Sequence, residues 1–133
     1  MTVQDHLRQA RQNEELANKL GSPPLEAYDW ATTVMFYALL HVVDASLLER
    51  HHLIPRGHTA TWNRQRRQRI PGRHDDVKPY LPEMYDASKL LSDASRRARY
   101  EGAYLTSGSV GDYQNLKNNE FASARAFFRQ FGW

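Results

Sequence analysis

Phe36-Tyr37-Ala38-Leu39-Leu40-His41-Val42-Val43-Asp44-Ala45 is the stretch that decides the fold of this chain. It lies within residues 24–51, where apolar side chains recur every three or four positions, the spacing of one face of an α-helix. The pattern predicts a long core helix with a histidine on its apolar face. An unpaired polar group costs roughly 1–3 kcal/mol to bury, so we expect the fold to give His41 a partner. The predicted face consists of Ala27, Trp30, Val34, Tyr37, His41, Ala45 and Leu48.

Four other segments have helical spacing or helix boundary signals. Thr2 can cap the first of them, and Gly21 is placed to end it. Pro71-Gly72 stops a short, basic helix, and the last two helices carry apolar stripes of their own. No strand is predicted, so the expected fold class is all-α: an up-and-down bundle of four to five helices in one domain spanning residues 1–133. These further helices cover about residues 2–20, 59–69, from 78–82 to 100, and 112–131. The apolar stripe of the helix that ends near residue 100 consists of Tyr80, Met84, Ala87, Leu91, Ala94 and Ala98.

The composition favours a folded, soluble protein. Of the 133 residues, 41% are hydrophobic and 25% are charged, values typical of globular domains. The longest apolar run, residues 34–40, is too short to cross a bilayer, and the start of the chain has no apolar signal region. We therefore expect a cytoplasmic protein with no membrane partner. The absence of cysteine excludes a disulfide scaffold, a thiolate metal site and a cysteine nucleophile.

Positive charge is concentrated in one part of the chain. The net charge is only +3, yet residues 56–73 hold a block of arginines and no acid. Such a block suits a polyanion such as RNA, because guanidinium groups bind phosphate in a bidentate manner. A solvated helix face would have the same composition, so that alternative stays open. The block contains Arg56, Arg64, Arg66, Arg67, Arg69 and Arg73, of which Arg64, Arg66 and Arg67 are the candidate binding residues.

The histidines and aspartates of the chain allow two kinds of chemistry. His41 and Asp44 are three residues apart and therefore neighbours on one helix face. They can form either a proton-transfer pair or a structural clasp between helices. We predict neither a metal site nor a cofactor, because adjacent residues such as His51 and His52 point to different sides of a helix. A second polar cluster, at residues 95–100, contains Arg96, Arg97 and Arg99.

Three motifs occur in order along the chain: Phe36-Tyr37-Ala38-Leu39-Leu40-His41, Arg56-Gly57-His58 and Arg97-Ala98-Arg99-Tyr100. Together they resemble the HEPN family of small bacterial and archaeal helical bundles, and the resemblance covers about residues 25–128. It implies a bundle of four or five helices, often dimeric, that works on RNA or nucleotides, in some members beside a nucleotidyltransferase-type or antitoxin partner. The candidate binding residues within these motifs are Tyr37, His58, Arg99 and Tyr100, and Asp44 and Arg96, which lie near them in the sequence, are candidates as well.

The resemblance leaves three functions open. Nucleases of the family carry an Arg-x4–6-His motif on a helix, whereas the formal matches here end at His74 and cross Pro71-Gly72, which interrupts a helix. We therefore expect first an RNA- or nucleotide-binding module without catalysis. One alternative is a metal-independent ribonuclease of toxin–antitoxin or defence type, with His41 and either Arg97 or Arg96 as catalytic residues by position. The other is a helical dimerisation or adaptor module, in which Trp62, Tyr104 and Tyr113 are either exposed anchors or packing residues.

Overall fold

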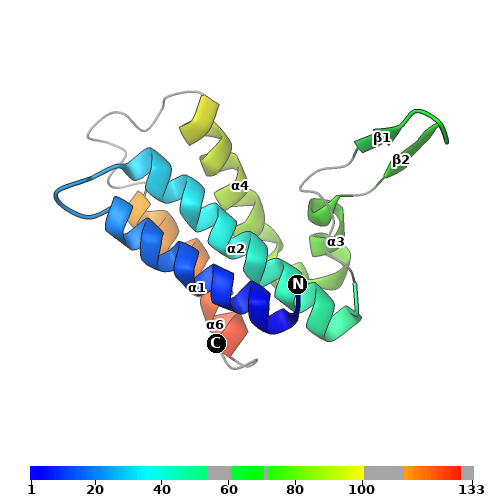
Figure 1. The fold of residues 1–133 in the computed structure, drawn as a ribbon, viewed down its shortest axis with the longest axis horizontal. Helices are drawn as coiled ribbons and strands as arrows, with labels where there is room; N and C mark the ends of the chain where they lie inside the picture. The colour runs from blue at the N-terminus through cyan, green and yellow to red at the C-terminus, as the bar shows by residue number, and fades with distance from the viewer. Residues whose placement is uncertain (54–60, 71, 101–112, 130–133) are drawn as a thin grey trace.

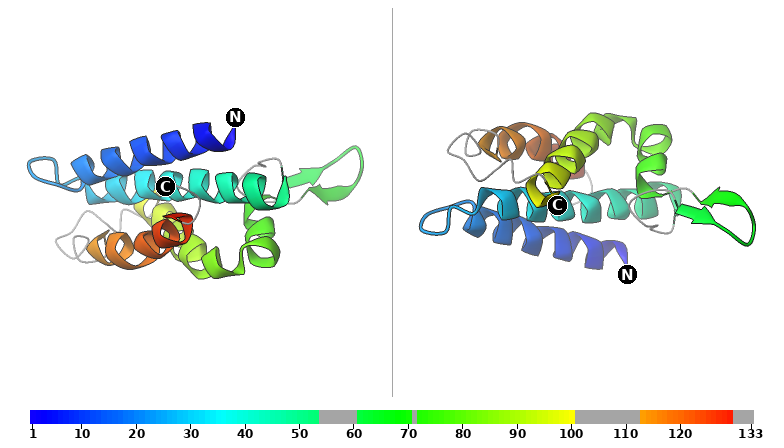
Figure 2. Two further views of the ribbon diagram at one scale, coloured as in Figure 1. Left: turned by 90° about the horizontal axis from the view of Figure 1, so that it is seen from below. Right: turned by 90° about the horizontal axis from the view of Figure 1, so that it is seen from above.

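The computed structural model describes residues 1–53, 61–70, 72–100 and 113–129 and shows an all-α helical bundle, as predicted (Figure 1). α1(Val3–Leu20) and α2(Tyr28–His51) lie side by side and run in opposite directions. α3(Arg73–Tyr80) and the short 3-10 helix η1(Pro82–Met84) lead into α4(Tyr85–Tyr100), which returns across α2. Figure 2 shows α2 as the middle layer, with α1 on one side and α4 and α6(Ala122–Arg129) on the other.

Both ends of α1 have the boundaries that the sequence predicts. The Thr2 hydroxyl accepts a hydrogen bond from the Asp5 backbone N–H at 3.1 Å, and the Asp5 carboxylate accepts one from the Thr2 N–H at 2.9 Å. Gly21 ends the helix, but with a φ of −86° that any residue can adopt. Glycine is needed there for space, because a Cβ on Gly21 would lie 2.6 Å from Cζ of the Tyr113 ring.

α2 begins at Tyr28 rather than near residue 24, and its buried face differs from the predicted one. Two members of that face are largely open to solvent: Trp30 is 60% exposed and Tyr37 is 36% exposed. The reason is that α2 packs on both sides and is buried nearly all round, so a single apolar stripe does not describe it. Its buried residues are Ala31, Thr32, Thr33, Met35, Phe36, Ala38, Leu39, Leu40, Val42, Val43, Asp44, Ala45, Ser46 and Leu47.

Among the described residues, α2 is also the one helix long and apolar enough to cross a membrane. The core helix of a soluble protein passes the same test, and 78% of the apolar window of α2 is buried inside the bundle. This burial accounts for its composition without a bilayer.

The predicted short helix at residues 59–69 is wrong. A β-hairpin occupies the described part of this segment, with β1(Thr61–Asn63) pairing antiparallel to β2(Gln68–Ile70). The Asn63 side chain accepts hydrogen bonds from the N–H groups of Gln65 at 3.1 Å and Arg66 at 3.0 Å, and Arg67 takes a positive φ of 49°. Asparagine therefore captures the backbone donors that a helix would use, and a turn results. The hairpin projects away from the bundle (Figure 1).

The helix predicted to start at residues 78–82 and to end near residue 100 starts later. α3 ends at Tyr80, and Pro82 opens η1 before α4 begins at Tyr85. Most of the predicted apolar stripe is buried, but Tyr80 is 40% exposed and Ala87 is half-buried. The stripe residues that lie in the core are Met84, Leu91, Ala94 and Ala98.

The closing helix is present, although a π-helical stretch interrupts it after its first described residues, 113–115, which are α-helical. η2(Leu116–Phe121) is a π-helical stretch that continues into α6. Tyr113, which precedes it, is 1% exposed and donates a hydrogen bond to the Ala17 carbonyl at 3.1 Å. Tyr113 is therefore a packing residue and not an exposed anchor. Tyr104 lies outside the described residues, as do positions 112 and 130–131 of the predicted helix.

Candidate functional site

Four polar side chains from three helices meet inside the bundle. His6 comes from α1, His41 and Asp44 from α2, and Arg73 from the first turn of α3. Nδ1 of His6 lies 3.1 Å from Nδ1 of His41, within hydrogen-bond distance. Arg73 donates to both oxygens of Asp44, through Nε to Oδ1 and through Nη2 to Oδ2 at 2.7 Å. We call these four residues the buried cluster.

The buried cluster supplies the partners that the sequence requires, but not in the predicted pairing. His41 pairs with His6, and Asp44 pairs with Arg73, so the expected His41–Asp44 pair is replaced by two pairs to other helices. Asp44 and Arg73 expose only 4% and 11% of their side chains. A buried charge needs a hydrogen-bonded counter-charge, and the two-pronged contact provides it. The cluster thus fastens both α1 and α3 to the central helix.

Both imidazoles of the buried cluster favour the neutral form. Burial lowers the pKa of His6, while the Asp44 charge acts in the opposite direction. Burial also lowers the pKa of His41, and the neighbouring His6 lowers it further. A neutral imidazole carries one N–H and one lone pair, so one Nδ1 can donate to the other. Nε2 of His6 is buried without a hydrogen-bond partner, and this unsatisfied atom lowers the stability of the fold.

His6, His41 and Asp44 also form a group that has the composition of a metal site. Their ligand atoms lie within 4.8 Å of one another. Both Asp44 oxygens already accept hydrogen bonds from Arg73, however, and the guanidinium charge would repel a cation. The donor set therefore reduces to two imidazoles, fewer than the three protein ligands of a typical catalytic zinc site. The geometry suits proton sharing between the histidines better than metal binding.

A second group of predicted residues lies at the surface where α2 begins and α4 ends. Arg99 donates a hydrogen bond to the Tyr37 hydroxyl at 3.1 Å, which joins two candidate residues that are 62 positions apart. Arg96 is exposed and lies 3.5 Å from Asp93, and Arg97 is exposed on the same helix. Arg97 is not part of the buried cluster, so the structure does not group it with His41 as a catalytic pair.

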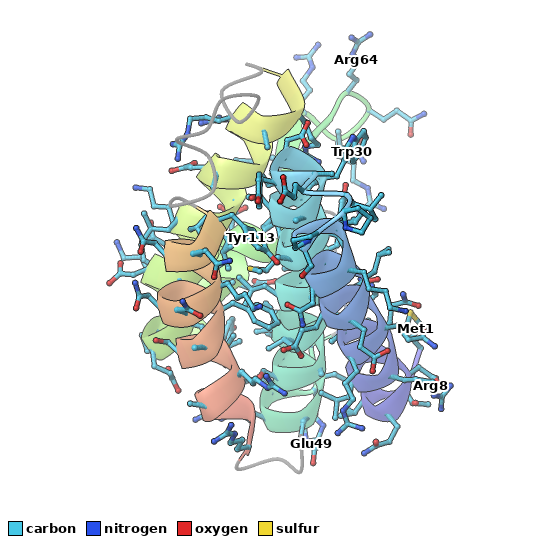
Figure 3. The ribbon with its side chains drawn as sticks, turned by 90° about the vertical axis from the view of Figure 1, so that its left-hand side faces the viewer. Met1, Arg8, Trp30, Glu49, Arg64 and Tyr113 are labelled. Atoms are coloured by element: carbon cyan, nitrogen blue, oxygen red, sulfur yellow. The ribbon has the colours of Figure 1, made fainter. Side chains whose placement is uncertain are left out.

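The third group is the tip of the hairpin. Arg64, Arg66 and Arg67 are exposed there, and the contacts of the described residues give their guanidinium groups no acidic partner. Figure 3 shows the Arg64 side chain extending away from the bundle. Arg69, at the base of the hairpin, is instead paired with Asp75 at 2.6 Å. Within the described part of the arginine block, Arg69 and Arg73 are therefore paired with aspartates, whereas Arg64, Arg66 and Arg67 are exposed.

Sequence reasoning missed two residues of these groups. His6 shares a buried face of α1 with Leu7 and Ala10, so its periodicity was a usable signal. Arg73 gave no such signal, because it is one of several arginines in the basic block. Among the predicted residues, His58 lies outside the described part of the chain, and the side chain of Tyr100 is not described.

Comparisons of the chain with models of known families, with curated proteins and with solved structures gave no match.

Proposed function

We propose that this protein is an RNA-binding module of HEPN type and that the hairpin tip is its main contact with the phosphate backbone. The observation that carries the proposal is the set of three exposed arginines at the tip, within a segment that has no acid between residues 56 and 73. Exposed arginines without acidic partners bind phosphate oxygens and release counterions, which drives binding to nucleic acids. The resemblance of the helical motifs to the HEPN family favours RNA as the polyanion.

The base of the hairpin supports this proposal because it holds the tip in place. Asp75 accepts from Nη2 of Arg69 at 2.6 Å and from the Gly72 N–H at 2.8 Å. One carboxylate thus joins the second strand to the start of α3. Arg73, in the first turn of that helix, is fixed to Asp44 of α2. The base of the hairpin is therefore tied to the bundle by charged contacts, which reduces how much of the hairpin must be ordered on binding, while each tip arginine that binds still loses side-chain freedom.

Salt dependence tests the phosphate contacts. Three contacts to single-stranded RNA predict a slope of about −2 for log affinity against log salt, so affinity should fall roughly 20-fold between about 50 and 200 mM salt. Reversing all three charges, as in Arg64→Glu, Arg66→Glu and Arg67→Glu, should abolish this binding. The matched control reverses three exposed cations elsewhere, Lys19, Lys89 and Arg129, with the same change in net charge. Equal losses in both triple variants would show that only net charge matters and would contradict the proposal.

The variant Asp75→Asn tests whether the hairpin binds RNA as an anchored element or as a loose basic segment. Removing this acid adds one positive unit to the net charge, so electrostatics alone predicts tighter RNA binding. Loss of the Arg69–Asp75 pair frees the base of the hairpin, so the proposal predicts weaker binding in spite of the added charge. Fluorescence anisotropy with a labelled single-stranded RNA gives the sign of the change.

Metal-independent RNA cleavage is the second candidate function. It is favoured by the His6–His41 contact, because two imidazoles that are neutral near pH 7 can accept and return a proton, and by the partial exposure of His41. Cleavage of a labelled RNA pool in EDTA should be lost in His41→Gln while the thermal midpoint changes little. A folded wild-type protein that binds RNA and leaves it intact would exclude this candidate and keep the binding module.

A further inference from the structure

A groove lies between the first turns of α2 and the last turn of α4, away from both the hairpin and the buried cluster. Asp29, Trp30 and Thr33 line it from α2, and Ala98 and Arg99 line it from α4. Its volume is about 260 Å³, which suits one flat ring system better than a whole drug-sized ligand. Figure 3 labels Trp30 near the start of α2, at the end of that helix where the groove lies.

The aromatic side of the groove is unusually exposed for its residue type. The Trp30 side chain is 60% exposed, and Tyr37 follows two helical turns later on the same face of α2. Tryptophan has a large apolar face and is normally buried at a core or an interface. An exposed indole at the edge of a groove is therefore a surface on which a planar ligand can stack.

Charge divides the groove into two ends. Arg99 supplies a guanidinium group, oriented by its hydrogen bond of 3.1 Å to the Tyr37 hydroxyl, and Arg96 lies one turn earlier on α4. Asp29 supplies a carboxylate, whose Oδ1 accepts from the Trp30 backbone N–H at 2.8 Å. A phosphate is attracted to the arginine end and repelled by the carboxylate end. A base has N–H donors that a carboxylate can accept, and every RNA base has at least one.

We propose that this groove binds one nucleotide of a single-stranded RNA, with the base stacked on Trp30 and its phosphate against Arg99. The inference rests on the proposed RNA binding but assigns it a second surface, distinct from the hairpin tip. Stacking on an aromatic ring and pairing of phosphates with arginine are the two contacts by which proteins hold single strands without reading their sequence. A larger hollow of about 390 Å³ between α1 and α6 lacks this chemistry, since its described lining holds two glutamates, Glu14 and Glu15, and no aromatic side chain on which a base could stack.

Trp30→Ala tests the stacking contact. Removal of one base–aromatic stack weakens RNA binding roughly fivefold to a hundredfold. The same variant should bind an abasic ribose-phosphate strand as the wild-type protein does, because that strand has no base to stack. Trp30→Phe keeps a smaller ring and should recover part of the affinity for RNA. Leu90→Ala is the matched control, since Leu90 is 49% exposed on α4 and does not line the groove.

The outcomes separate this inference from the proposed function. Loss of RNA binding confined to base-containing strands supports the groove. Wild-type affinity of Trp30→Ala for RNA, beside a large loss in the hairpin triple variant, overturns the groove and keeps the hairpin. A wild-type protein that binds no RNA overturns both. A change from dimer to monomer in Trp30→Ala, measured by light scattering, would assign the indole to a protein contact and also overturn the groove.

Discussion

Replacing Arg73 by methionine should destabilise the protein strongly, because it leaves the buried Asp44 carboxylate without its counter-charge. Methionine keeps most of the apolar stem of arginine and removes only the guanidinium group. Asp44, with 4% of its side chain exposed, would then lose both hydrogen bonds, and Nδ1 of His6, 4.0 Å from its Oδ2, is too far away to replace them. Breaking a buried ion pair from one side costs about 3–5 kcal/mol. That is a large share of the roughly 5–15 kcal/mol by which a domain is stable.

The partner variant should behave differently, and the difference tests the reasoning. Asp44→Asn leaves a guanidinium group that is already 11% exposed and has a long stem with which to reach water, so we expect a smaller loss. The double variant should be more stable than the sum of the two single losses predicts, because no unpaired charge remains. Arg96→Met serves as the control: it breaks an exposed pair with Asp93 and should cost less than about 1 kcal/mol.

Urea unfolding followed by circular dichroism measures these effects. A stability change should move the midpoint and leave the slope unchanged. For a chain of this size the loss in Arg73→Met corresponds to a fall in thermal midpoint of roughly 10–20 °C. A midpoint within the range of Arg96→Met, or losses that add without coupling in the double variant, would refute the view that the Asp44–Arg73 pair fastens α3 to α2.

Three further predictions concern other parts of the bundle. Burial lowers the pKa of His6 and His41 below that of the unfolded chain, so the unfolded state binds protons first as the pH decreases. The free energy of unfolding should therefore be constant above about pH 6.5 and fall below it. His6→Gln should reduce this pH dependence, which urea titrations from about pH 7.5 to 5 measure. Gly21→Ala should lower stability by about 1–3 kcal/mol, since its Cβ would enter the Tyr113 ring, whereas backbone entropy alone would raise stability; the sign of the midpoint shift decides. Thr2→Ala should cost about 1 kcal/mol through loss of the cap on α1, and an unchanged thermal midpoint would contradict that role.

Three of the helices were readable from sequence, but the orientation of the central helix was not. Periodicity located α1 and α2 to within a few residues and the end of α4 at residue 100, because each has apolar residues at helical spacing, whereas no helix was predicted over residues 73–77 of α3. In α2 the apolar residues occur on every side, since the helix is covered by α1 on one side and by α4 and α6 on the other. A stripe drawn through Trp30 and Tyr37 then selects the one face that the bundle leaves open. Exposed aromatic residues on a nearly fully buried helix are a signal that spacing alone does not show.

The hairpin and the buried cluster depend on information that spacing does not hold. The arginine-rich segment was taken as a helix, yet Asn63 directs a turn through two backbone hydrogen bonds. In the cluster, His41 meets a residue 35 positions earlier and Asp44 meets one 29 positions later. Sequence predicted that both polar groups on α2 need partners, which is a local statement about the cost of burial. It did not predict which residues are the partners of His41 and Asp44, because that depends on how three helices pack.

The pairing of charges also indicates where binding should be sought. The most chemically suggestive residues, two histidines, an aspartate and an arginine, contact one another inside the bundle, although Nε2 of His6 has no hydrogen-bond partner and His41 is partly exposed. Arg69 is likewise paired at the base of the hairpin. The charges at Arg64, Arg66 and Arg67 and the open face of Trp30 have no such use in holding the described fold together. Removing these side chains should change binding and leave the fold intact, because they cost little to expose and stabilise nothing nearby. The binding proposal can therefore be tested separately from the stability of the protein.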